Sequence, residues 1–542
     1  MWQLRPVPHY VLSNVYQRVW GARLVVRRRN SCVVCDGSGV PRKAHRRSHT
    51  LCRTARRRNA ARGAEAEQNV QLFLRWAAKQ RWPAAGGQFY RRSPVPYQVC
   101  SARKTPRRHD YGVELPVDGE AGVVEVSEIR GIQGLLGFID ACPTPFHVVD
   151  RAAAVLRSSG FTELNEADEW PDASGSRFVR RGGSLVAWRH QNCEAGFRII
   201  GAHTDSPNLR VTAQPDTGQA GYRQLGVEVY GGALINSWLD RDLGVAGRLA
   251  TLAGQRLFQI DQPVLRVPQL AIHLDRDVNK EGLLLNPQTH IVPVWGLGLR
   301  TPGEFASVVA EAAGVDADEV LAWDAMLHDL TPSTVAGIDG DFIHAPRIDN
   351  QVSCWAGLHA LIDAPADSPP SAVLCLFDHE EVGSTSAQGA ASTLLPTVLE
   401  RIAGSRGALH PALARSLCVS ADGAHATHPN YPERHEPDHH FAMGDGPVIK
   451  RNANQRYATD AVGEAAFAAV CEKAGVGHQL YVHRGDMPCG STIGPFAASA
   501  TGVTTVDVGV AQLSMHSARE MCGAQDPLDF AVALSAFLSV AD

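Results

Sequence analysis

The sequence lacks the features that would place it in a membrane or a secretory pathway. None of its apolar runs is long enough to cross a bilayer, so we expect no membrane partner. Arginines interrupt residues 1–29, which therefore lack the apolar core of a secretory signal. The 12 cysteines are scattered singly, apart from Cys32 and Cys35. These absences predict mostly reduced thiols and a cytoplasmic protein.

Acidic residues are scarce in the first fifth of the chain. Residues 1–110 hold 24 Lys+Arg against 4 Asp+Glu, a balance of +20, and the remainder carries −24, which gives the net charge of −4. Three interpretations of residues 1–123 stay open: a disordered basic extension, a start codon placed too early, and a nucleic-acid-binding arm. We favour the first two, and so expect no nucleic-acid partner.

From residue 124 onward the sequence has the pattern of an α/β protein. Helices are predicted over residues 129–142 and 144–158. Continuous apolar runs predict four strands that helices bury on both faces: Phe197–Gly201, Ala372–Phe377, Leu417–Ser420 and Thr504–Val508. Residues 209–337 carry alternating runs broken by turn residues, which predicts an inserted β-rich domain. The predicted fold is therefore an α/β/α sandwich of residues 124–208 and 338–542, with residues 209–337 inserted.

Side chains that bind metal lie close to the ends of the predicted strands. They follow the strands directly or through a loop: His203, Glu380, Glu381, Asp422 and His516. Because ligands of open α/β sheets bind at the carboxyl ends of the strands, we expect these side chains to share one edge. Asp349 begins a helical stretch, where it either caps the helix or bridges two cations with its two oxygens.

Each of these residues also has an ordinary structural interpretation. A lone His203 is more often a core histidine, Asp422 a turn former and His516 a surface residue. The Glu380–Glu381 pair is harder to explain in that way, because adjacent carboxylates after a buried strand repel each other unless a cation neutralises them. Two histidines, two aspartates and one glutamate suit two adjacent cations, and the second glutamate is free to act as a base. This is the equipment of a metal-assisted hydrolase.

Seven segments resemble the aspartyl aminopeptidases, which are dinuclear zinc exopeptidases. The resemblance runs from about Val124 to the C-terminus, in the order of the family. It is carried by Gly201–Val211 (GAHTDSPNLRV), Trp238–Arg248 (WLDRDLGVAGR), Phe377–Ala390 (FDHEEVGSTSAQGA), Ser420–Tyr431 (SADGAHATHPNY), Gly446–Thr459 (GPVIKRNANQRYAT), Pro488–Pro495 (PCGSTIGP) and Met515–Met521 (MHSAREM).

The resemblance implies a role for each candidate residue. One cation would be bound by Asp349, Glu381 and His516, and the other by His203, Asp349 and Asp422. Asp205 would orient His203, and Glu380 would be the general base. Substrate contacts are implied for four residues: His273, His425, Lys450 and Tyr457. His273 would reach the active site of a neighbouring subunit in a homododecamer, with the inserted domain making dimer contacts and so serving oligomerisation.

The sequence therefore predicts a metal-dependent aminopeptidase that removes N-terminal residues from peptides and prefers Asp or Glu, which Lys450 could pair with. A water that bridges the metals would attack the scissile carbonyl while Glu380 takes its proton. Two divalent cations are implied; Zn²⁺ is expected, and Co²⁺ and Mn²⁺ accept the same ligands. A related dinuclear deacylase or carboxypeptidase stays open as the alternative. Removal of residues 1–123 should leave peptidase activity intact and abolish any salt-sensitive nucleic-acid binding.

Overall fold

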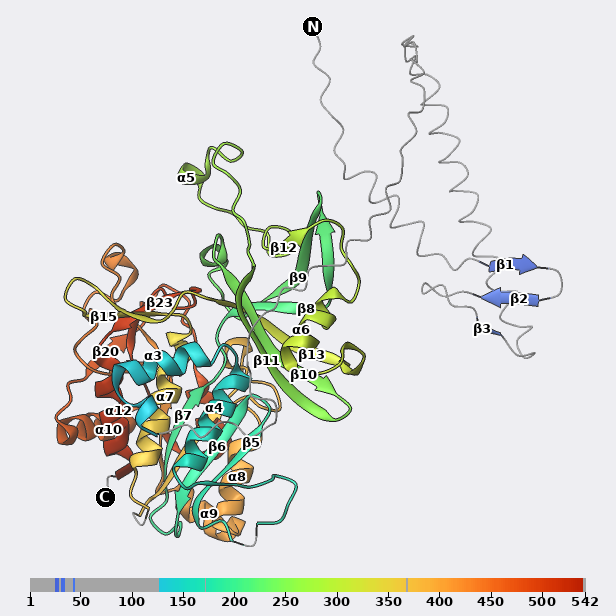
Figure 1. The fold of residues 1–542 in the computed structure, drawn as a ribbon. Coiled ribbons are helices and arrows are strands. Elements are labelled where there is room, and N and C mark those ends of the chain that lie inside the picture. Colours follow the sequence, from blue (N-terminus) through green and yellow to red (C-terminus); the bar gives the residue numbers. More distant parts are fainter. Residues whose placement is uncertain are drawn as a thin grey trace, which may run out of the picture. The chain divides into compact units, whose positions relative to one another are not determined.

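The computed structural model describes residues 126–170, 172–366 and 369–539, together with three short strands near the N-terminus (Figure 1). Contacts divide the chain into two compact units, residues 1–111 and 112–542. In the first unit β2 (Ser31–Val34) pairs antiparallel with β1 (Val25–Arg28) and with β3 (Arg42–Lys43). The rest of residues 1–123, and with it the choice between the three interpretations of that segment, lies outside the described residues.

A nine-stranded sheet forms the centre of the second unit. Its order is β20 (Gln479–Val482), β19 (Val448–Arg451), β21 (Thr504–Gly509), β17 (Leu417–Ala421), β7 (Phe197–His203), β16 (Ser371–Phe377), β6 (Ser184–His190), β5 (Gly175–Arg181) and β4 (Thr162–Glu163). The neighbours β21, β17, β7 and β16 run parallel. These are the four strands that the apolar runs predict, so those predictions are confirmed.

Helices cover both faces of this sheet, because its strands are apolar on both sides. Along β7, Phe197 and Ile199 pack into one core, whereas Ile200 and Ala202 pack into the other. One face carries α3 (Gly131–Ala141), α4 (Pro145–Ser158), α7 (Ile348–Asp363), α10 (Ala461–Ala474) and α12 (Asp526–Ser539). The opposite face carries α8 (Leu394–Ala403), α9 (Arg406–Leu413) and α11 (Ile493–Thr501). The α/β/α sandwich is confirmed, as are the two predicted helices, with α3 beginning two residues late, after the short turn η1 (Val126–Ile129).

A second, antiparallel sheet follows β7. Its order is β11 (Gly254–Leu265), β10 (Leu243–Thr251), β13 (Ala322–Asp329), β8 (Asn208–Gln219), β9 (Tyr222–Tyr230) and β12 (Val294–Leu297). Along β9, Leu225 and Val227 are buried beside α6 (Glu304–Ala313), while Glu228 is exposed, the alternation typical of a sheet with one solvated face. A long loop that carries α5 (Val278–Glu281) extends from this sheet (Figure 1).

Short strands form a third sheet of five strands. Its order is β14 (Thr334–Ala336), β15 (Phe342–Ala345), β23 (Glu520–Gly523), β22 (Ala511–Leu513) and β18 (Ala424–His425). Both larger sheets belong to one compact unit, so the domain boundaries at residues 208 and 337 stay a prediction. Within the described residues, no helix combines the length and the hydropathy that a membrane span requires.

Candidate metal centre

Three of the predicted ligand segments meet at the carboxyl ends of neighbouring parallel strands. His203 is the last residue of β7 and lies opposite Phe377, the last residue of β16. Glu380 and Glu381 follow β16 in the short turn η4 (Glu380–Val382). Asp422 comes directly after β17, on the other side of β7. The strand order therefore brings residues of three segments, up to 219 positions apart, to one edge of the sheet, as the sequence predicts.

Asp349 and His516 reach this edge from other elements. Asp349 lies near the start of α7, where its backbone is not helical, and no side-chain cap is formed at the Arg347 N-cap. Among the described residues no backbone N–H donates to the Asp349 carboxylate, so Asp349 does not cap this helix and the capping interpretation is wrong. His516 lies between β22 and β23. The sequence predicts a single loop after β21 there, and the short strand β22 interrupts that loop.

The five side chains form two groups that share Asp349. In one group the Nε2 atom of His203 lies 3.2 Å from Asp349 Oδ1 and 3.7 Å from Asp422 Oδ1. In the other, the Nε2 atom of His516 lies 3.4 Å from Asp349 Oδ2 and 3.3 Å from Glu381 Oε1. Each group thus collects three donor atoms of the kind that zinc prefers, and the two oxygens of Asp349 point to different groups.

The hydrogen bonds of the two histidines fix which ring nitrogen faces the carboxylates. Nδ1 of His203 is 2.9 Å from the Asp205 carbonyl, and Nδ1 of His516 is 3.2 Å from the Gly232 carbonyl. A carbonyl only accepts, so each Nδ1 carries the hydrogen and each Nε2 presents a lone pair. Lone pairs then face carboxylate oxygens, an arrangement that needs a cation or an added proton between them.

Charge and burial support a cation at this place. Asp349 Oδ1 and Glu381 Oε1 are buried and receive no hydrogen bond, which is costly for a carboxylate unless a positive charge compensates it. Burial alone would lower the pKa of His516, but the neighbouring Asp349 and Glu381 raise it to about 10. In the cation-free chain a proton thus takes the place that a metal would fill, and the donor set fits two divalent cations.

Asp205 organises the turn that carries the two glutamates. Its buried carboxylate accepts the backbone N–H of Glu380 at Oδ1 and that of Glu381 at Oδ2, both at 3.1 Å. The same carboxylate lies 3.5 Å from Nδ1 of His203, farther than the Asp205 carbonyl. The carbonyl orients the imidazole, and the carboxylate holds the turn.

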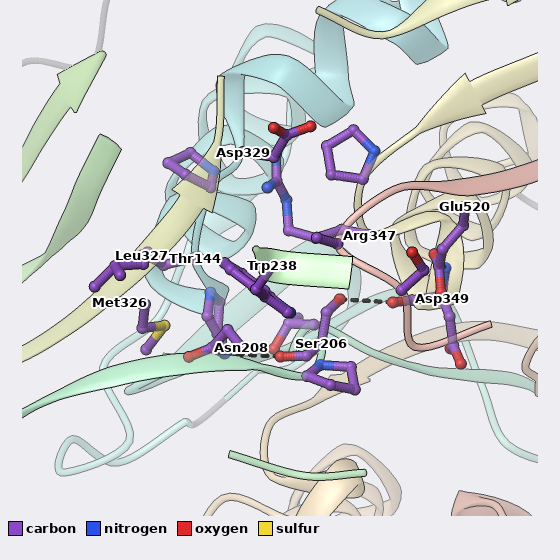
Figure 2. Close-up of a pocket in the computed structure, with 17 residues that line it drawn as sticks. Thr144, Ser206, Asn208, Trp238, Met326, Leu327, Asp329, Arg347, Asp349 and Glu520 are labelled. Atoms are coloured by element: carbon purple, nitrogen blue, oxygen red, sulfur yellow. Dashed lines mark hydrogen bonds between the residues drawn. The ribbon is translucent and has the colours of Figure 1, made fainter. Parts of the chain in front are cut away.

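Glu520 plays the corresponding part on the other side of the centre, and the sequence analysis assigned it no role. Its buried carboxylate accepts the backbone N–H of Asp349 at 2.9 Å and that of His516 at 2.6 Å. Glu520 and Asp349 line a small cavity of about 20 Å³, which is room for about one water (Figure 2). The Ser206 hydroxyl donates to the Asp349 carbonyl at 2.6 Å. The signal in the sequence is the position of Glu520 within MHSAREM, four residues after His516.

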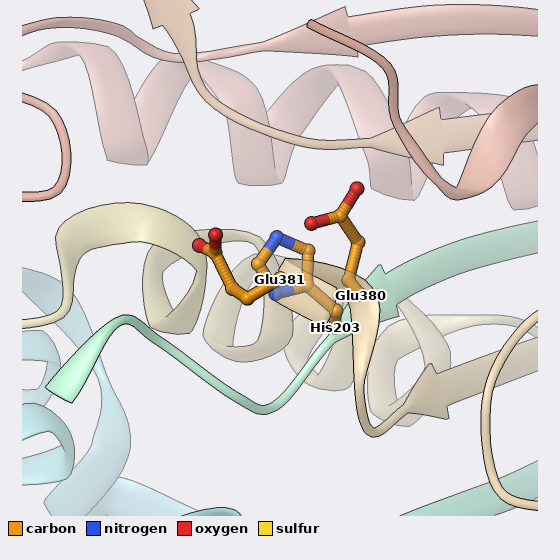
Figure 3. Close-up of side chains that lie close together, drawn as sticks. All are labelled: His203, Glu380 and Glu381. Atoms are coloured by element: carbon orange, nitrogen blue, oxygen red, sulfur yellow. The ribbon is translucent and has the colours of Figure 1, made fainter. Parts of the chain in front are cut away.

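Glu380 differs from the other carboxylates in having no partner for its side chain. Figure 3 shows the imidazole of His203 between the carboxylates of Glu380 and Glu381. Among the described residues, no hydrogen-bond donor contacts the Glu380 carboxylate, which is half-buried. Burial raises its pKa to about 8, with Asp422 adding to the effect and His203 opposing it. A free carboxylate with an elevated pKa beside a metal-binding group suits a general base.

The predicted substrate residues fall into two sets. Lys450, in β19, is buried rather than on the surface, and its ammonium donates to the carbonyls of Asp422 at 2.9 Å and Gly423 at 3.0 Å. Its Nζ lies 5.2 Å from the ring centroid of Tyr457. His425, in β18, lies 6.2 Å from the ring of Tyr481, in the same aromatic cluster. Lys450 therefore contacts the main chain of the ligand Asp422, Tyr457 lies near Lys450, and His425 belongs to the aromatic cluster around Tyr481.

His273 is not brought to this centre within one chain. It lies exposed in the loop that follows β11, and no hydrogen bond or ion pair in the described part of the chain joins it to the five ligands. The action of His273 on a neighbouring subunit therefore stays a prediction.

The chain is similar to a family of zinc peptidases over most of its length. The family profile described as "Aminopeptidase I zinc metalloprotease (M18)" matches residues 138–538. "Probable M18 family aminopeptidase 2" of Mycobacterium leprae is 54% identical over 420 residues, which cover 75% of this chain and 97% of that protein. The protein of the same name from Streptomyces coelicolor is 51% identical over 416 residues, 74% of this chain and 96% of that one.

Solved structures show the same similarity. A chain of the Ape4 and Nbr1 complex is 37% identical, with a TM-score of 0.72 over 75% of this chain and 85% of that chain. The S. cerevesiae mApe1 dodecamer is 30% identical, with a TM-score of 0.66 over 75% and 95% of the two chains. An M18 aminopeptidase from Thermotoga Maritima, at 23% identity and a TM-score of 0.68, shows the shared fold alone.

Proposed function

The chain belongs to the M18 family of zinc-dependent aminopeptidases, and from this premise we propose that it removes N-terminal Asp or Glu from peptides at the centre built around Asp349. The observation that carries the proposal is the pair of ligand groups, each with an imidazole lone pair facing carboxylates, that share the two oxygens of Asp349. The carboxylates of this centre outnumber its imidazoles, so protons on His203 and His516 leave buried negative charge that divalent cations would neutralise.

The two groups would each hold one cation: His203, Asp349 and Asp422 the first, and Asp349, Glu381 and His516 the second. When bound, two such cations polarise the scissile carbonyl and make a water acidic enough to attack at neutral pH. Asp205 and Glu520 each accept hydrogen bonds from the backbone N–H groups of two site residues. These hydrogen bonds would fix the metal ligands before substrate binds.

Glu380 would move the proton of the reaction. Its unpartnered carboxylate takes the proton of the attacking water and returns it to the departing amine, so that one residue serves as base and then as acid. His425, which lies in β18 three residues after the ligand Asp422, would donate to the oxyanion that forms on the substrate. Positive charge nearby lowers the pKa of Glu380 from its cation-free value toward that of a working base.

Lys450 would select an acidic first residue, and Lys450→Ala tests this. The ammonium uses two of its three hydrogens on the Asp422 and Gly423 carbonyls, which leaves one for a substrate carboxylate. We expect kcat/KM for an Asp substrate, relative to a Leu substrate, to fall by roughly 10- to 100-fold. The kcat/KM values for both substrates should also fall, because Lys450 supports the main chain of the ligand Asp422. The ratio of the two kcat/KM values is therefore the quantity that tests acid recognition. Lys473→Ala, which removes an exposed lysine of α10, is the control, and an unchanged ratio in Lys450→Ala would place acid recognition elsewhere.

Assembly into a homododecamer would bring His273 to a neighbouring active site. One support is the dodecameric mApe1 neighbour. Another is the set of apolar side chains in the same stretch of chain as His273 that are 45–90% exposed: Leu270, Ile272, Leu274 and Leu284. Light scattering should give a mass near 700 kDa, twelve times the 58.3 kDa chain. His273→Ala should keep this mass and its metals but lose turnover. A fully active monomer would refute the proposal.

A cytoplasmic location is part of the same proposal. All eight cysteines described in the second unit are free thiols, which agrees with a reducing compartment: Cys142, Cys193, Cys354, Cys375, Cys418, Cys471, Cys489 and Cys522. Activity recovered outside the cytoplasmic fraction of the native host would contradict it.

A further inference from the structure

The end of β9 lies directly against the centre. Three consecutive residues, Tyr230, Gly231 and Gly232, leave the second sheet there and contact residues that three different segments supply. The Tyr230 hydroxyl donates to Asp205 Oδ2 at 2.7 Å, and the Gly232 carbonyl accepts from Nδ1 of His516 at 3.2 Å. None of these three residues is among the predicted site residues.

The two glycines allow this approach. A Cβ on Gly231 would lie 3.0 Å from Cβ of Glu381, and a Cβ on Gly232 would lie 3.1 Å from Nδ1 of His516. Gly231 also has a φ of +68°, which side-chain-bearing residues rarely adopt. Backbone rather than side chain therefore packs against both Glu381 and His516.

The hydroxyl of Tyr230 adds a third hydrogen bond to the Asp205 carboxylate. The carboxylate of Asp205 is fully buried and accepts the N–H groups of Glu380 and Glu381. Tyr230 adds a donor to the same oxygen that accepts from Glu381. Without the Tyr230 hydroxyl, the Asp205 carboxylate would keep only its hydrogen bonds to the Glu380–Glu381 turn. The carboxylate and the turn could then shift together.

The ring of Tyr230 is itself held in place. The Arg210 guanidinium carbon lies 3.6 Å from its centroid, a close cation–π contact from the neighbouring strand β8. Tyr230 is only 8% exposed. The hydroxyl therefore has one direction available, toward Asp205.

We propose that Tyr230 is a positioning residue of the metal centre, and that Tyr230–Gly232 forms a brace by which the second sheet fixes the site. The brace fixes the Glu380–Glu381 turn through Asp205 and the imidazole of His516 through the Gly232 carbonyl. This inference rests on the proposed function, because it assumes that Glu381 and His516 bind zinc. The second sheet would thus position metal-binding residues of the first.

Tyr230→Phe in the full-length chain tests the hydroxyl, with zinc as the probe. Residues that orient metal ligands typically contribute 10- to 100-fold to metal affinity or activity, so we expect the zinc dissociation constant, measured by competition with a chromogenic chelator, to rise roughly tenfold or more. The fully zinc-loaded variant should lose kcat with little change in KM. Tyr222→Phe, on the exposed end of the same strand, should change neither quantity.

Gly232→Ala provides a second variant that keeps the hydroxyl. Its Cβ would press on His516, so zinc affinity should fall, whereas Gly137→Ala, where the space around a Cβ is open, should leave it unchanged. Folded Tyr230→Phe and Gly232→Ala proteins with wild-type zinc affinity and kcat would overturn the brace. Wild-type protein that binds no zinc would instead overturn the proposed function, so the two failures are distinguishable.

Discussion

Replacement of Glu380 by glutamine is expected to leave two metals bound and to lower kcat by about 10²–10⁴. The amide keeps the shape of the side chain but cannot accept the proton of the attacking water. Glu380 lies within reach of His203 and Glu381, but it belongs to neither of the two groups that share Asp349, so metal binding at those groups should survive. Metal content measured on the purified variant, together with kcat on an Asp substrate, tests both parts of the expectation.

Glu381→Gln is the matched control, since it makes the same change one residue away. Glu381 belongs to the group with Asp349 and His516, so its variant should lose a metal rather than a base. The two variants should thus fail differently: Glu380→Gln inactive with its metals, and Glu381→Gln inactive through their loss. Near-normal turnover by Glu380→Gln would remove Glu380 from the mechanism.

Replacement of Asp349 by alanine is expected to remove both metals and to abolish activity. Asp349 Oδ1 faces His203 and Oδ2 faces His516, so one substitution takes a ligand from each group. Asp422→Ala, which changes a single group, should keep the metal at the other. Metal counts of about two, one and none for wild type, Asp422→Ala and Asp349→Ala form the expected series.

Stability separates this effect from simple unfolding. In the metal-free protein the Asp349 carboxylate faces the imidazoles of His203 and His516 at 3.2 and 3.4 Å and, against the effect of burial, raises the pKa of both, so its removal should lower the Tm measured after chelation. A cooperative unfolding transition of chelated Asp349→Ala would show that the variant is nevertheless folded. Added zinc should raise the Tm of the wild type alone. An Asp349→Ala protein that retains two metals would show that the bridge lies elsewhere.

The sequence predicts the centre of the fold well because the physical signal is local. The strands β7, β16, β17 and β21 are continuous apolar runs, and helices on both faces are the only way to bury them. Once those strands are parallel, residues at their ends must meet, and this places His203, Glu381 and Asp422 together. The assignment of individual roles came from resemblance, since spacing alone left a turn former, a core histidine and a surface residue open.

What the sequence does not predict depends on partners far away in the chain. In the sequence, Tyr230 is simply the last residue of an alternating apolar run. Its neighbours do not indicate that its hydroxyl donates to Asp205, 25 residues earlier. Glu520 contacts the backbone of Asp349 across 171 residues. Lys450 follows apolar residues like a surface lysine at a strand end, yet it is buried because Asp422 and Gly423 supply carbonyls for its ammonium.

Hydrolysis of a panel of aminoacyl chromogenic substrates (Asp, Glu, Leu, Ala and Lys), before and after chelation and zinc re-addition, tests the central claim most directly. We expect cleavage led by Asp or Glu, loss of that cleavage on chelation, and its return with zinc. Metal-dependent cleavage led by Leu or Ala would keep the mechanism and remove the acidic preference. No cleavage of any substrate by protein that holds two metals would contradict the proposed function and favour a deacylase or carboxypeptidase.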